Sequence, residues 1–242
     1  MSNPPLSQLV ISAELAMNNS DFVSAARDFQ AATLIKENDP YLIQQYALAT
    51  YKSKQPTPVE ALKKAREIIH QLHPEHTDDC ETLGIAAAIH KKLWLIEWNA
   101  NDIKQAVEYY GRGFIECKNY HCGENYALCL NLQASIETNI ARQYALNESA
   151  KKVREQLVVI LDKIAQAPDF EDKPDKKWVL ATMANCLFAL GRTEEGHFYE
   201  AILYLEKEDV FNQWQRDTYE FEKLQLLKLL NTKSSTSYRY LQ

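Results

Sequence analysis

The spacing of small and aromatic residues in the stretch DFVSAARDFQAA, residues 21–32, decides the fold. Asp21 belongs to the residue types that cap helices, because its carboxylate accepts a hydrogen bond from a free amide of the first turn. Ala25, Phe29 and Ala32 follow at steps of four and three residues, which return to one face of a helix. This pattern predicts a helix whose small residues let a second helix approach closely.

Outward from this stretch, small residues recur at spacings similar to the 34-residue tetratricopeptide template, in a degraded form. Ala13 supplies the small residue of the preceding helix. Later matches are Ala49 with Ala61, Ala106 with Tyr110 and Gly113, and Ala184 with Gly196. The intervals from Ala25 to Ala61 and from Ala61 to Ala106 are 36 and 45 residues, so the predicted array is irregular.

Breaks in the helical pattern divide the chain into segments of helix length. We predict an all-α fold, a right-handed superhelical stack of about five antiparallel helix pairs, with a final helix over about residues 212–230 that covers the open end. The fourth pair is expected near Gly123–Glu137 and Asn147–Gln166. Caps are expected at Asp21, at Thr57 with Glu60, at Asp102 with Gln105, and at Thr193. We expect one domain over residues 1–232 and a tail over residues 233–242.

Composition narrows the function. The chain has 242 residues, of which 46% are apolar, and a formal net charge of -6 from 27 Lys and Arg against 33 Asp and Glu. Bases and acids are interspersed, so the sequence lacks the basic stripe that nucleic acids or anionic membranes attract. No segment resembles a targeting or membrane-spanning element. We therefore expect a soluble, cytoplasmic protein whose partner is another protein or a second copy of itself.

The cysteines give no sign of a disulfide framework. Cys80, Cys117, Cys122, Cys129 and Cys186 are odd in number, form no CxxC pair and lie within helical patterns. We predict that all five are reduced thiols serving as small buried apolar groups.

Three short motifs indicate a more specialised family. They are Glu81-Thr82-Leu83-Gly84, Tyr109-Tyr110-Gly111-Arg112-Gly113-Phe114 and Tyr120-His121-Cys122-Gly123-Glu124-Asn125-Tyr126-Ala127. They resemble the TRAF-binding tetratricopeptide region of the apoptosis signal-regulating kinases and its stand-alone bacterial relatives, over about residues 40–205. His121 and Glu124 depart from that family's pattern. The resemblance implies a regulatory module that docks proteins or neighbouring domains, without kinase activity, since the kinase motifs are absent from the sequence.

Two groups of His and Cys residues offer an alternative reading as catalytic or metal sites. The groups are His70, His73, His76 with Cys80, and Cys117, His121, Cys122 with Cys129. Pro74 ends the helix that would align the first group, and the spacing of the second matches no zinc knuckle or ribbon. A hydrolase or zinc-dependent enzyme is therefore the alternative to a chain with no catalytic residue, metal or cofactor.

Two basic runs raise a third possibility, an RNA-binding helical repeat. They are Lys63-Lys64-Ala65-Arg66 and Lys151-Lys152-Val153-Arg154. Each run falls on the second helix of its pair, whose outer face is normally solvated, and acids such as Glu60 and Glu155 surround it. We interpret both runs as solvated surface.

The first helix of each pair is expected to line the concave side of the stack. A stripe of aromatic, amide and charged residues there suits a bound peptide or a neighbouring domain. The predicted binding residues are Tyr46, Thr50, Lys91, Trp98, Glu124, Asn131, Trp178 and Asn185. We expect the polar ones to be exposed and to contribute little to folding. The alternative for the aromatic ones is that neighbouring repeats or the last helix pack against them.

Overall fold

The structure is a computed structural model, and it describes residues 4–205 and 213–232. Within these residues every regular element is a helix, and none is a β-strand. The chain divides into two compact units, residues 1–117 and 118–242. A compact unit is a cluster of contacts, so the expectation of one domain over residues 1–232 stays a prediction. The predicted tail lies outside the described residues.

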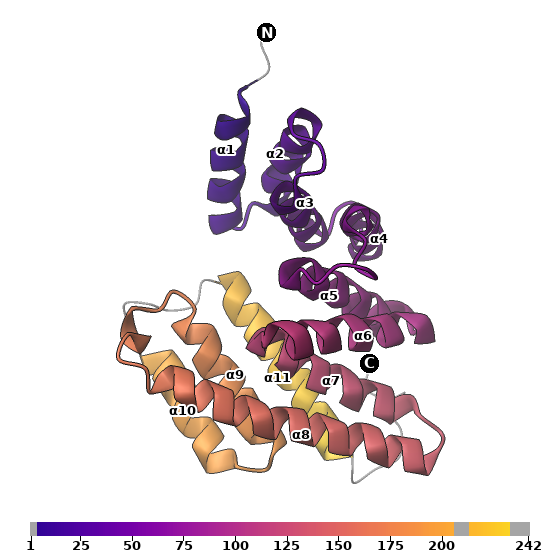
Figure 1. The fold of residues 1–242 in the computed structure, drawn as a ribbon, viewed down its shortest axis with the longest axis vertical. Helices are drawn as coiled ribbons and strands as arrows, with labels where there is room; N and C mark the ends of the chain where they lie inside the picture. The colour runs from indigo at the N-terminus through magenta and orange to yellow at the C-terminus, as the bar shows by residue number, and fades with distance from the viewer. Residues whose placement is uncertain (1–3, 206–212, 233–242) are drawn as a thin grey trace. The chain divides into compact units, whose positions relative to one another are not determined.

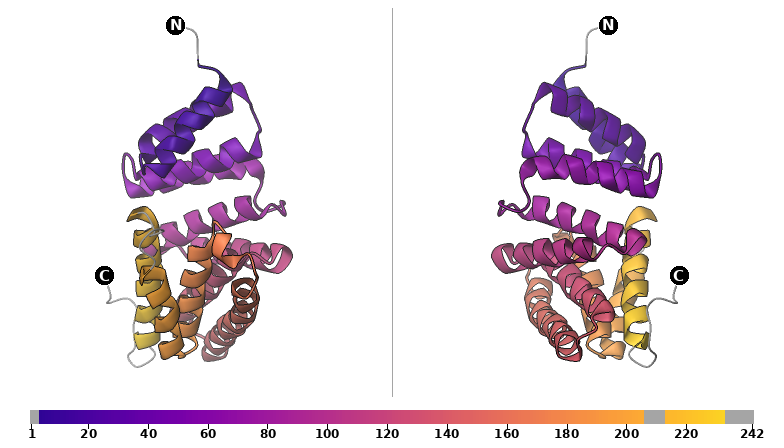
Figure 2. Two further views of the ribbon diagram at one scale, coloured as in Figure 1. Left: turned by 90° about the vertical axis from the view of Figure 1, so that its left-hand side faces the viewer. Right: turned by 90° about the vertical axis from the view of Figure 1, so that its right-hand side faces the viewer.

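The first unit is built from three helix pairs, shown in Figures 1 and 2. Its elements are α1 (Leu6–Asn18), α2 (Phe22–Ile35), α3 (Pro40–Ser53), α4 (Pro58–Ile69), the short 3-10 helix η1 (His70–Leu72), α5 (Cys80–Glu97) and α6 (Ala100–Cys117). Each helix packs against the next one along the chain, so that every pair lies against its neighbour.

The second unit contains two helix pairs and a final helix. Its elements are α7 (Tyr120–Ile136), α8 (Ile140–Ala165), the short 3-10 helix η2 (Phe170–Asp172), α9 (Lys176–Ala189), α10 (Thr193–Leu205) and α11 (Gln213–Thr232). Helix α11 packs on α9, where Leu226 and Leu230 meet Ala184 and Phe188. The predicted all-α fold, with tetratricopeptide-like pairs and a final helix, is confirmed.

Side-chain caps explain where several helices begin. The carboxylate of Asp21 accepts a hydrogen bond from the Ser24 amide at 3.1 Å. Thr57 Oγ1 accepts from the Glu60 amide at 3.2 Å and donates to the Glu60 carboxylate at 2.6 Å. Both predicted caps are therefore confirmed, and each satisfies amides that the first turn leaves without helical partners.

Two predicted helix starts are wrong. Helix α6 begins at Ala100, so Asp102 lies inside its first turn and is not a cap. Its carboxylate accepts a hydrogen bond from His90 instead. Helix α8 begins at Ile140, well before the expected Asn147, because the side chain of Asn139 accepts a hydrogen bond from the Arg142 amide at 3.1 Å.

The small residues that predicted close packing are enclosed. Ala13, Ala25, Phe29 and Ala32 have 0% of their surface exposed, and they form one apolar cluster between α1, α2 and α3. At Gly196 in the second unit, an added β-carbon would lie 2.7 Å from the Phe188 ring. The spacing of small residues therefore marks real points of contact between helices.

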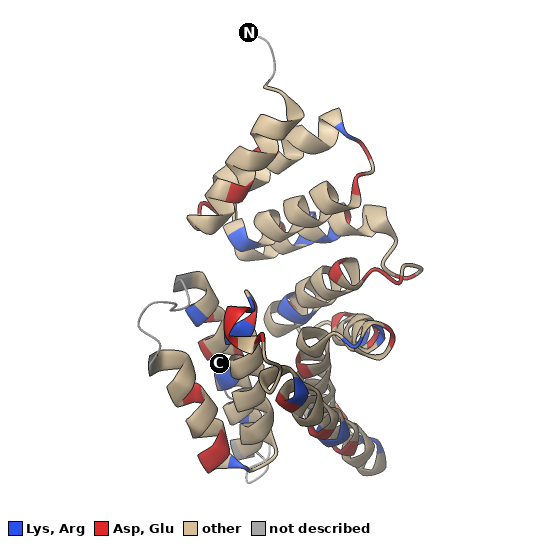
Figure 3. Ribbon diagram, turned by 60° about the vertical axis from the view of Figure 1, so that its left-hand side comes forward, with Lys and Arg blue, Asp and Glu red and all other residues tan. Residues whose placement is uncertain are grey.

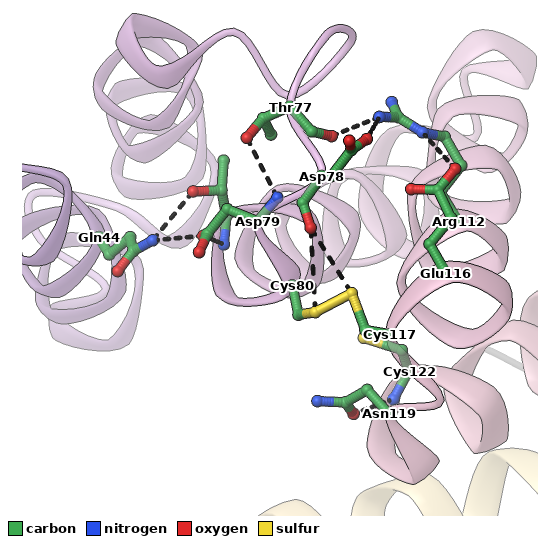
Figure 4. Close-up of a disulfide and its surroundings, with 11 residues drawn as sticks. Gln44, Thr77, Asp78, Asp79, Cys80, Arg112, Glu116, Cys117, Asn119 and Cys122 are labelled. Carbon is green, nitrogen blue, oxygen red and sulfur yellow. Dashed lines mark hydrogen bonds and ion pairs between the residues drawn. A yellow bond between two sulfur atoms is a disulfide. The ribbon is translucent and has the colours of Figure 1, made fainter.

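Cys80 and Cys117 form a disulfide, shown in Figure 4. Their Cα atoms are 6.3 Å apart, within the range that a disulfide spans. Cys80 is the first residue of α5 and Cys117 the last of α6, so an antiparallel hairpin brings together residues that are 37 positions apart. The prediction of five reduced thiols is wrong for this pair. Cys122, Cys129 and Cys186 form no disulfide and are buried.

Arg112 organises the segment that leads into the disulfide. Its guanidinium donates hydrogen bonds to the backbone oxygens of Pro74 at 2.9 Å and Glu75 at 3.1 Å, and also to that of Thr77. Figure 4 shows Arg112 reaching from α6 to this segment, between Thr77 and Glu116. One side chain thus fixes the connection between η1 and α5.

Candidate functional site

The predicted binding residues of the first unit are more enclosed than expected. Thr50 is 8% exposed, and its hydroxyl donates to the carbonyl of Tyr46 in the same helix at 2.7 Å. Lys91 is only 3% exposed, and its ammonium lies 5.8 Å from the centre of the Tyr110 ring. The expectation that Lys91 is exposed is wrong, because α5 packs against α3, α4 and α6. Tyr46 is half-buried.

Trp98 lies at the end of α5 rather than within the stripe. Its backbone is left-handed, with φ of 57°, and its amide donates to the Trp94 carbonyl to close the helix. Its ring centre is 4.9 Å from that of Trp94, which is fully buried. The side chain of Trp98 is therefore partly buried against its own helix.

The predicted residues of the second unit divide into two kinds. Glu124 on α7 and Asn185 on α9 are 4% and 3% exposed, so the expectation that they are exposed is wrong. Both lie on helices that are covered by neighbours, since α7 and α9 contact each other, α8 and α11. Trp178 is half-buried, with ring centres 6.2 Å from His121 and 6.4 Å from Trp214 of α11. The last helix therefore packs against this aromatic residue, as the alternative anticipated.

A line of hydrogen-bonded polar side chains runs between α7 and α8, and we call it the polar seam. The side-chain nitrogen Nδ2 of Asn147 donates to the backbone carbonyl of Gln143 at 3.1 Å, and Asn147 Oδ1 accepts from Asn131 Nδ2 at 2.7 Å. Asn131 Oδ1 in turn accepts from Arg154 Nη1 at 2.7 Å. Asn147 and Asn131 are half-buried, whereas Arg154 is 3% exposed. The seam thus runs from the surface to a buried guanidinium.

Arg154 has unused hydrogen-bonding capacity at the inner end of the seam. Within the described part of the chain, its Nε and Nη2 atoms are enclosed and have no hydrogen-bond partner. Asn185 Oδ1 on α9 is also enclosed, and it too has no hydrogen-bond partner within the described part of the chain. Buried polar groups of folded proteins nearly always find partners. The inner end of the seam, at Arg154, therefore has donors without a partner in the described chain.

The charges around Arg154 are partly balanced. Burial lowers the pKa of the guanidinium, and the nearby Glu124 carboxylate opposes this by favouring the charged form. Cys186, next to Asn185 on α9, interacts electrostatically with both residues, and burial raises the pKa of its thiol. The thiol is therefore kept protonated and is not a nucleophile at neutral pH.

A second buried polar cluster lies in the first unit, and we call it the histidine cluster. His90 Nδ1 and the Asp102 carboxylate are 2.6 Å apart, and these residues are 5% and 3% exposed. Arg66 Nη1 on α4 lies 3.6 Å from the same carboxylate. The His70 ring stands edge-on to His90, with centres 5.8 Å apart. Three helices and η1 thus meet at this cluster.

Burial keeps both imidazoles of the histidine cluster neutral. Desolvation lowers the pKa of His90, although the Asp102 carboxylate opposes the shift, and desolvation likewise lowers the pKa of His70. Within the described residues, the Nε2 atoms of both rings are enclosed without a hydrogen-bond partner. A second proton on either ring would have no acceptor at Nε2, and the resulting positive charge would be repelled by Arg66. This arrangement is typical of a buried structural pair.

The second unit also has a shallow cleft of about 320 Å³ between α8, α9 and α10. Its floor is apolar and includes Met183 and Leu187, both buried. Charged residues of both signs stand at its edge, and two of them, Arg192 and Glu195, form an ion pair with each other. The cleft has no preference for one sign of charge.

The predicted metal-binding groups are not assembled. No group of three or more His, Cys, Asp or Glu among the described residues could hold a metal ion. Cys80 and Cys117 are bonded to each other in the disulfide, while Cys122 and Cys129 are 2% and 0% exposed.

Among the residues that the structure describes, no helix is both long and apolar enough to cross a membrane.

Comparison with known proteins agrees with this architecture. Residues 21–130 match the family model of Tetratricopeptide Repeats-Sensor proteins. The match covers α2 to α6 and most of α7. No curated protein matches the chain significantly. Tetratricopeptide repeats generally mediate interactions between proteins.

One solved structure is similar to this chain along its length. It is a tetratricopeptide repeat protein from Parabacteroides merdae ATCC 43184, with 15% sequence identity and a TM-score of 0.43. The similarity covers 97% of this chain and 94% of that one.

Sequence reasoning missed Arg154, the central residue of the seam. The run Lys151-Lys152-Val153-Arg154 was interpreted as solvated surface, which is wrong for Arg154, although Lys151 and Lys152 are exposed. The signal was helical spacing, because Arg154 follows Ala150 by four residues and precedes Leu157 by three. These two residues are fully buried, so Arg154 lies on the inward face of α8.

Proposed function

We propose that this chain is a non-catalytic protein-interaction module, and that the polar seam of its second unit holds a segment of a partner. The observation that carries this proposal is Arg154, a buried guanidinium with two nitrogens that lack partners in the described chain. Leaving such donors unsatisfied is costly, and sites that break local packing rules are commonly functional.

The predicted stripe supports this location. Asn131 bonds Arg154 directly, Glu124 interacts with its charge, and Asn185 carries the free acceptor on the next helix. In this proposal, Asn131, Glu124 and Asn185 of the predicted stripe contribute to binding. Half-buried Trp178 lies at the start of α9, as an aromatic contact of the kind that dominates interfaces.

The resemblance to the TRAF-binding region of the apoptosis signal-regulating kinases supports a regulatory role. We propose a scaffold in signalling, whose partner is a protein segment or a neighbouring domain. The distribution of charge favours a protein over RNA, because Figure 3 shows basic and acidic positions interspersed along the helices of each unit.

The proposal is tested by partner capture with matched variants. Wild-type protein is immobilised, and proteins retained from the native host are identified by mass spectrometry. The variant combining Asn131→Leu and Asn185→Leu removes one polar group of the seam and the unpartnered oxygen on α9 without adding charge. We expect it to lose these proteins at least about tenfold, equivalent to 1.4 kcal/mol of binding free energy.

The matched control changes exposed residues of the same helix. Lys151→Ala with Lys152→Ala alters the outer face of α8, and it should retain the wild-type set of proteins. Equal capture by the seam variant, once its circular dichroism and melting temperature show that it is folded, would contradict the proposed function. Loss in the control alone would move the binding surface to the outer face of α8.

We also propose that the protein is cytoplasmic, as the sequence predicted. Structural disulfides are uncommon in that compartment, so the state of Cys80 and Cys117 in cells is the relevant measurement. Alkylation of free thiols in freshly lysed cells, followed by mass spectrometry, should find a substantial reduced fraction. Complete oxidation would argue for an oxidising compartment. Light scattering on purified protein decides whether the chain also forms a homo-oligomer.

A further inference from the structure

We propose that Cys80 and Cys117 form a reversible redox switch. Its oxidised state ties the last turn of α6 to the start of α5, and its reduced state releases that turn in a protein that stays folded. The co-reactants are thiols and disulfides of the glutathione class. The switch lies within the first unit and does not rest on the proposed binding role of the polar seam. Cys117 is the last residue of the first unit, so the change occurs where the chain leaves that unit.

The two sulfurs are placed where a reductant can reach them. Cys80 and Cys117 are half-buried, and Figure 4 shows their disulfide beside the connection that leads into α5. The residues on either side of Cys117, Glu116 and Lys118, are exposed. Exposed disulfides are the ones that thiols reduce readily, and they are commonly regulatory. The position of this bond therefore favours reversible exchange.

Other contacts hold the start of α5 when the disulfide is open. Asp79 caps this helix, because its carboxylate accepts a hydrogen bond from the Thr82 amide at 2.7 Å. The same carboxylate accepts from Gln44 Nε2 of α3 at 2.6 Å. Arg112 holds the preceding segment through two backbone carbonyls. None of these hydrogen bonds involves a sulfur atom, so reduction leaves the start of α5 in place.

The end of α6 depends more on the disulfide. Phe114 is 6% exposed and is the last buried residue of this helix. Beyond it, Ile115 is 60% exposed and Glu116 is also exposed. Glu116 lies 3.8 Å from the Arg112 guanidinium, and an ion pair with an exposed partner contributes little. Reduction should therefore loosen residues 115–117 and leave the packed part of α6 in place.

Reduction proceeds by two thiol–disulfide exchanges. The thiolate of one glutathione molecule attacks one cysteine sulfur, which forms a mixed disulfide and breaks the bond between Cys80 and Cys117. The released cysteine thiolate takes up the proton that the attacking thiol gave up. A second glutathione thiolate attacks the glutathione sulfur of the mixed disulfide, and the other cysteine leaves and is protonated in the same way. The pair gains two electrons and two protons, and two glutathione molecules are oxidised to one disulfide.

The new thiol of Cys117 still has a neighbour in the reduced state. The backbone oxygen of Asp78 lies 3.6 Å from Cys117 Sγ, so it can accept a hydrogen bond from that thiol. A thiol is a weak donor. This contact is therefore a much weaker tether than the covalent bond that it replaces.

The experiment counts reactive thiols in the full chain by mass spectrometry. Folded protein is equilibrated with reduced and oxidised glutathione at a series of ratios, and free thiols are then alkylated with iodoacetamide. Cys122, Cys129 and Cys186 are 2%, 0% and 0% exposed, so they react slowly in the folded chain and the count reports the pair. We expect the count to change from none to two, along the same curve from either direction.

Three results of this titration would overturn the inference. A pair that stays oxidised in excess reduced glutathione is a structural disulfide, and a pair that never oxidises is not a switch. Alkylation of the three buried cysteines as soon as the pair is reduced would show that the disulfide is needed for folding.

Hydrogen exchange of the two end states locates the change. On reduction, the amides of residues 115–117 should exchange at least about tenfold faster, a larger change than anywhere in α5, while those of α8 keep their rates. The variant combining Cys80→Ser and Cys117→Ser is the matched control, because it has no pair to oxidise. It should resemble the reduced wild type in both glutathione states. Equal rates at residues 115–117 in oxidised and reduced wild type would show that the disulfide tethers nothing, and would also overturn the inference.

Discussion

The two units each bury charged side chains, but they satisfy them to different degrees. In the histidine cluster of the first unit, Asp102 accepts a hydrogen bond from neutral His90 on α5 and lies near the charged Arg66 on α4, so its carboxylate has partners on two helices. In the polar seam of the second unit, Arg154 is fixed by one hydrogen bond to Asn131, and its other two nitrogens lack partners within the described chain. We propose that the first arrangement stabilises the fold and that the second is retained for binding.

The two units also differ in how side chains link their helices. The first unit joins α5 to α6 by a disulfide and holds the preceding segment through Arg112. The second unit's cysteines, within the described residues, form no disulfide and are buried. If the seam is the binding site, as we propose, stability and binding are divided between the two units, a trade-off expected when a binding site carries unsatisfied groups.

The largest effect is expected from Asp102→Ala in the histidine cluster. This change removes the acceptor of His90 and leaves Arg66 facing a buried space without its carboxylate. Breaking a buried pair in this way costs about 3 kcal/mol. Urea unfolding measures the loss, and Glu108→Ala at an exposed position of the same helix should stay within about 0.5 kcal/mol of wild type. Equal stability of both variants would show that Asp102 is not a structural residue.

The disulfide is expected to have the next largest effect. Replacing Cys80 and Cys117 together by serine releases a closed loop with a sequence separation of 37, for which about 2–4 kcal/mol is typical. Because Arg112 still holds the segment before α5, we expect the lower end of this range. Hydrogen exchange should show lost protection in α5 and α6 and little change in α8. Loss of protection throughout α8 would contradict independent behaviour of the two units.

Acid should act through the histidine cluster and spare the polar seam. Both imidazoles have a pKa below the ordinary 6.5 in the folded chain, so the unfolded chain binds protons more readily. Their contribution to stability is therefore complete above pH 6.5 and is lost as the pH falls below it.

The groups that face this cluster are Arg66 from α4, His73 and Glu75 after η1, and Asp102 and Tyr109 from α6. Ionisable residues of α3 engage other partners, namely Tyr41 with Glu14, Tyr46 with Lys64, Tyr51 with Lys92 and Lys52 with Phe22.

The measurement is the melting temperature between pH 7.5 and pH 5. His90→Asn places an amide nitrogen where Nδ1 donates to Asp102, but it does not titrate, so the fall in melting temperature should be reduced. His76→Asn, at an exposed position whose charge does not act on either ring, should reproduce the wild-type curve. An identical pH dependence in wild type and His90→Asn would show that other groups cause the acid sensitivity.

The sequence predicts the helix pairs well because small residues and caps act locally. Ala25, Phe29 and Ala32 mark a packed face through spacing alone, and Thr57 with Glu60 forms its cap within one turn. Burial of polar residues depends on more than spacing, because it depends on which neighbouring helix covers them. Lys91 and Asn185 lie on first helices as predicted, yet α5 and α9 are covered by several neighbours and neither residue is exposed.

The same limit explains the errors at Asp102 and Cys80. Asp102 is of a residue type that caps helices. Only the packing of α5 against α6 shows that its carboxylate instead accepts a hydrogen bond from His90. Cys80 and Cys117 are 37 positions apart, and their pairing requires knowing that α5 and α6 run antiparallel for their full length. A register of the two helices, drawn from their ends, would have indicated this pair.

The smallest expected change in stability, and the one most informative for the comparison, is Asn185→Leu. Leucine is close to asparagine in size, and it removes a buried oxygen that has no partner within the described chain. Replacing an unsatisfied polar group by an apolar one of similar shape is neutral or stabilising, so we expect stability to rise by up to about 1 kcal/mol. Asn185→Ala is the matched variant, because it also removes the oxygen but leaves a cavity, and it should be less stable than Asn185→Leu.

Thermal unfolding of both variants decides the point. If Asn185→Leu is more stable than wild type while partner capture is lost, the free oxygen of Asn185 is retained for binding at the expense of the fold. Destabilisation of Asn185→Leu by 2 kcal/mol or more, beyond the roughly 0.5 kcal/mol scatter of surface changes, would show instead that a water molecule satisfies this oxygen in the folded protein. The polar seam would then resemble the histidine cluster, and the distinction between the two units would fall.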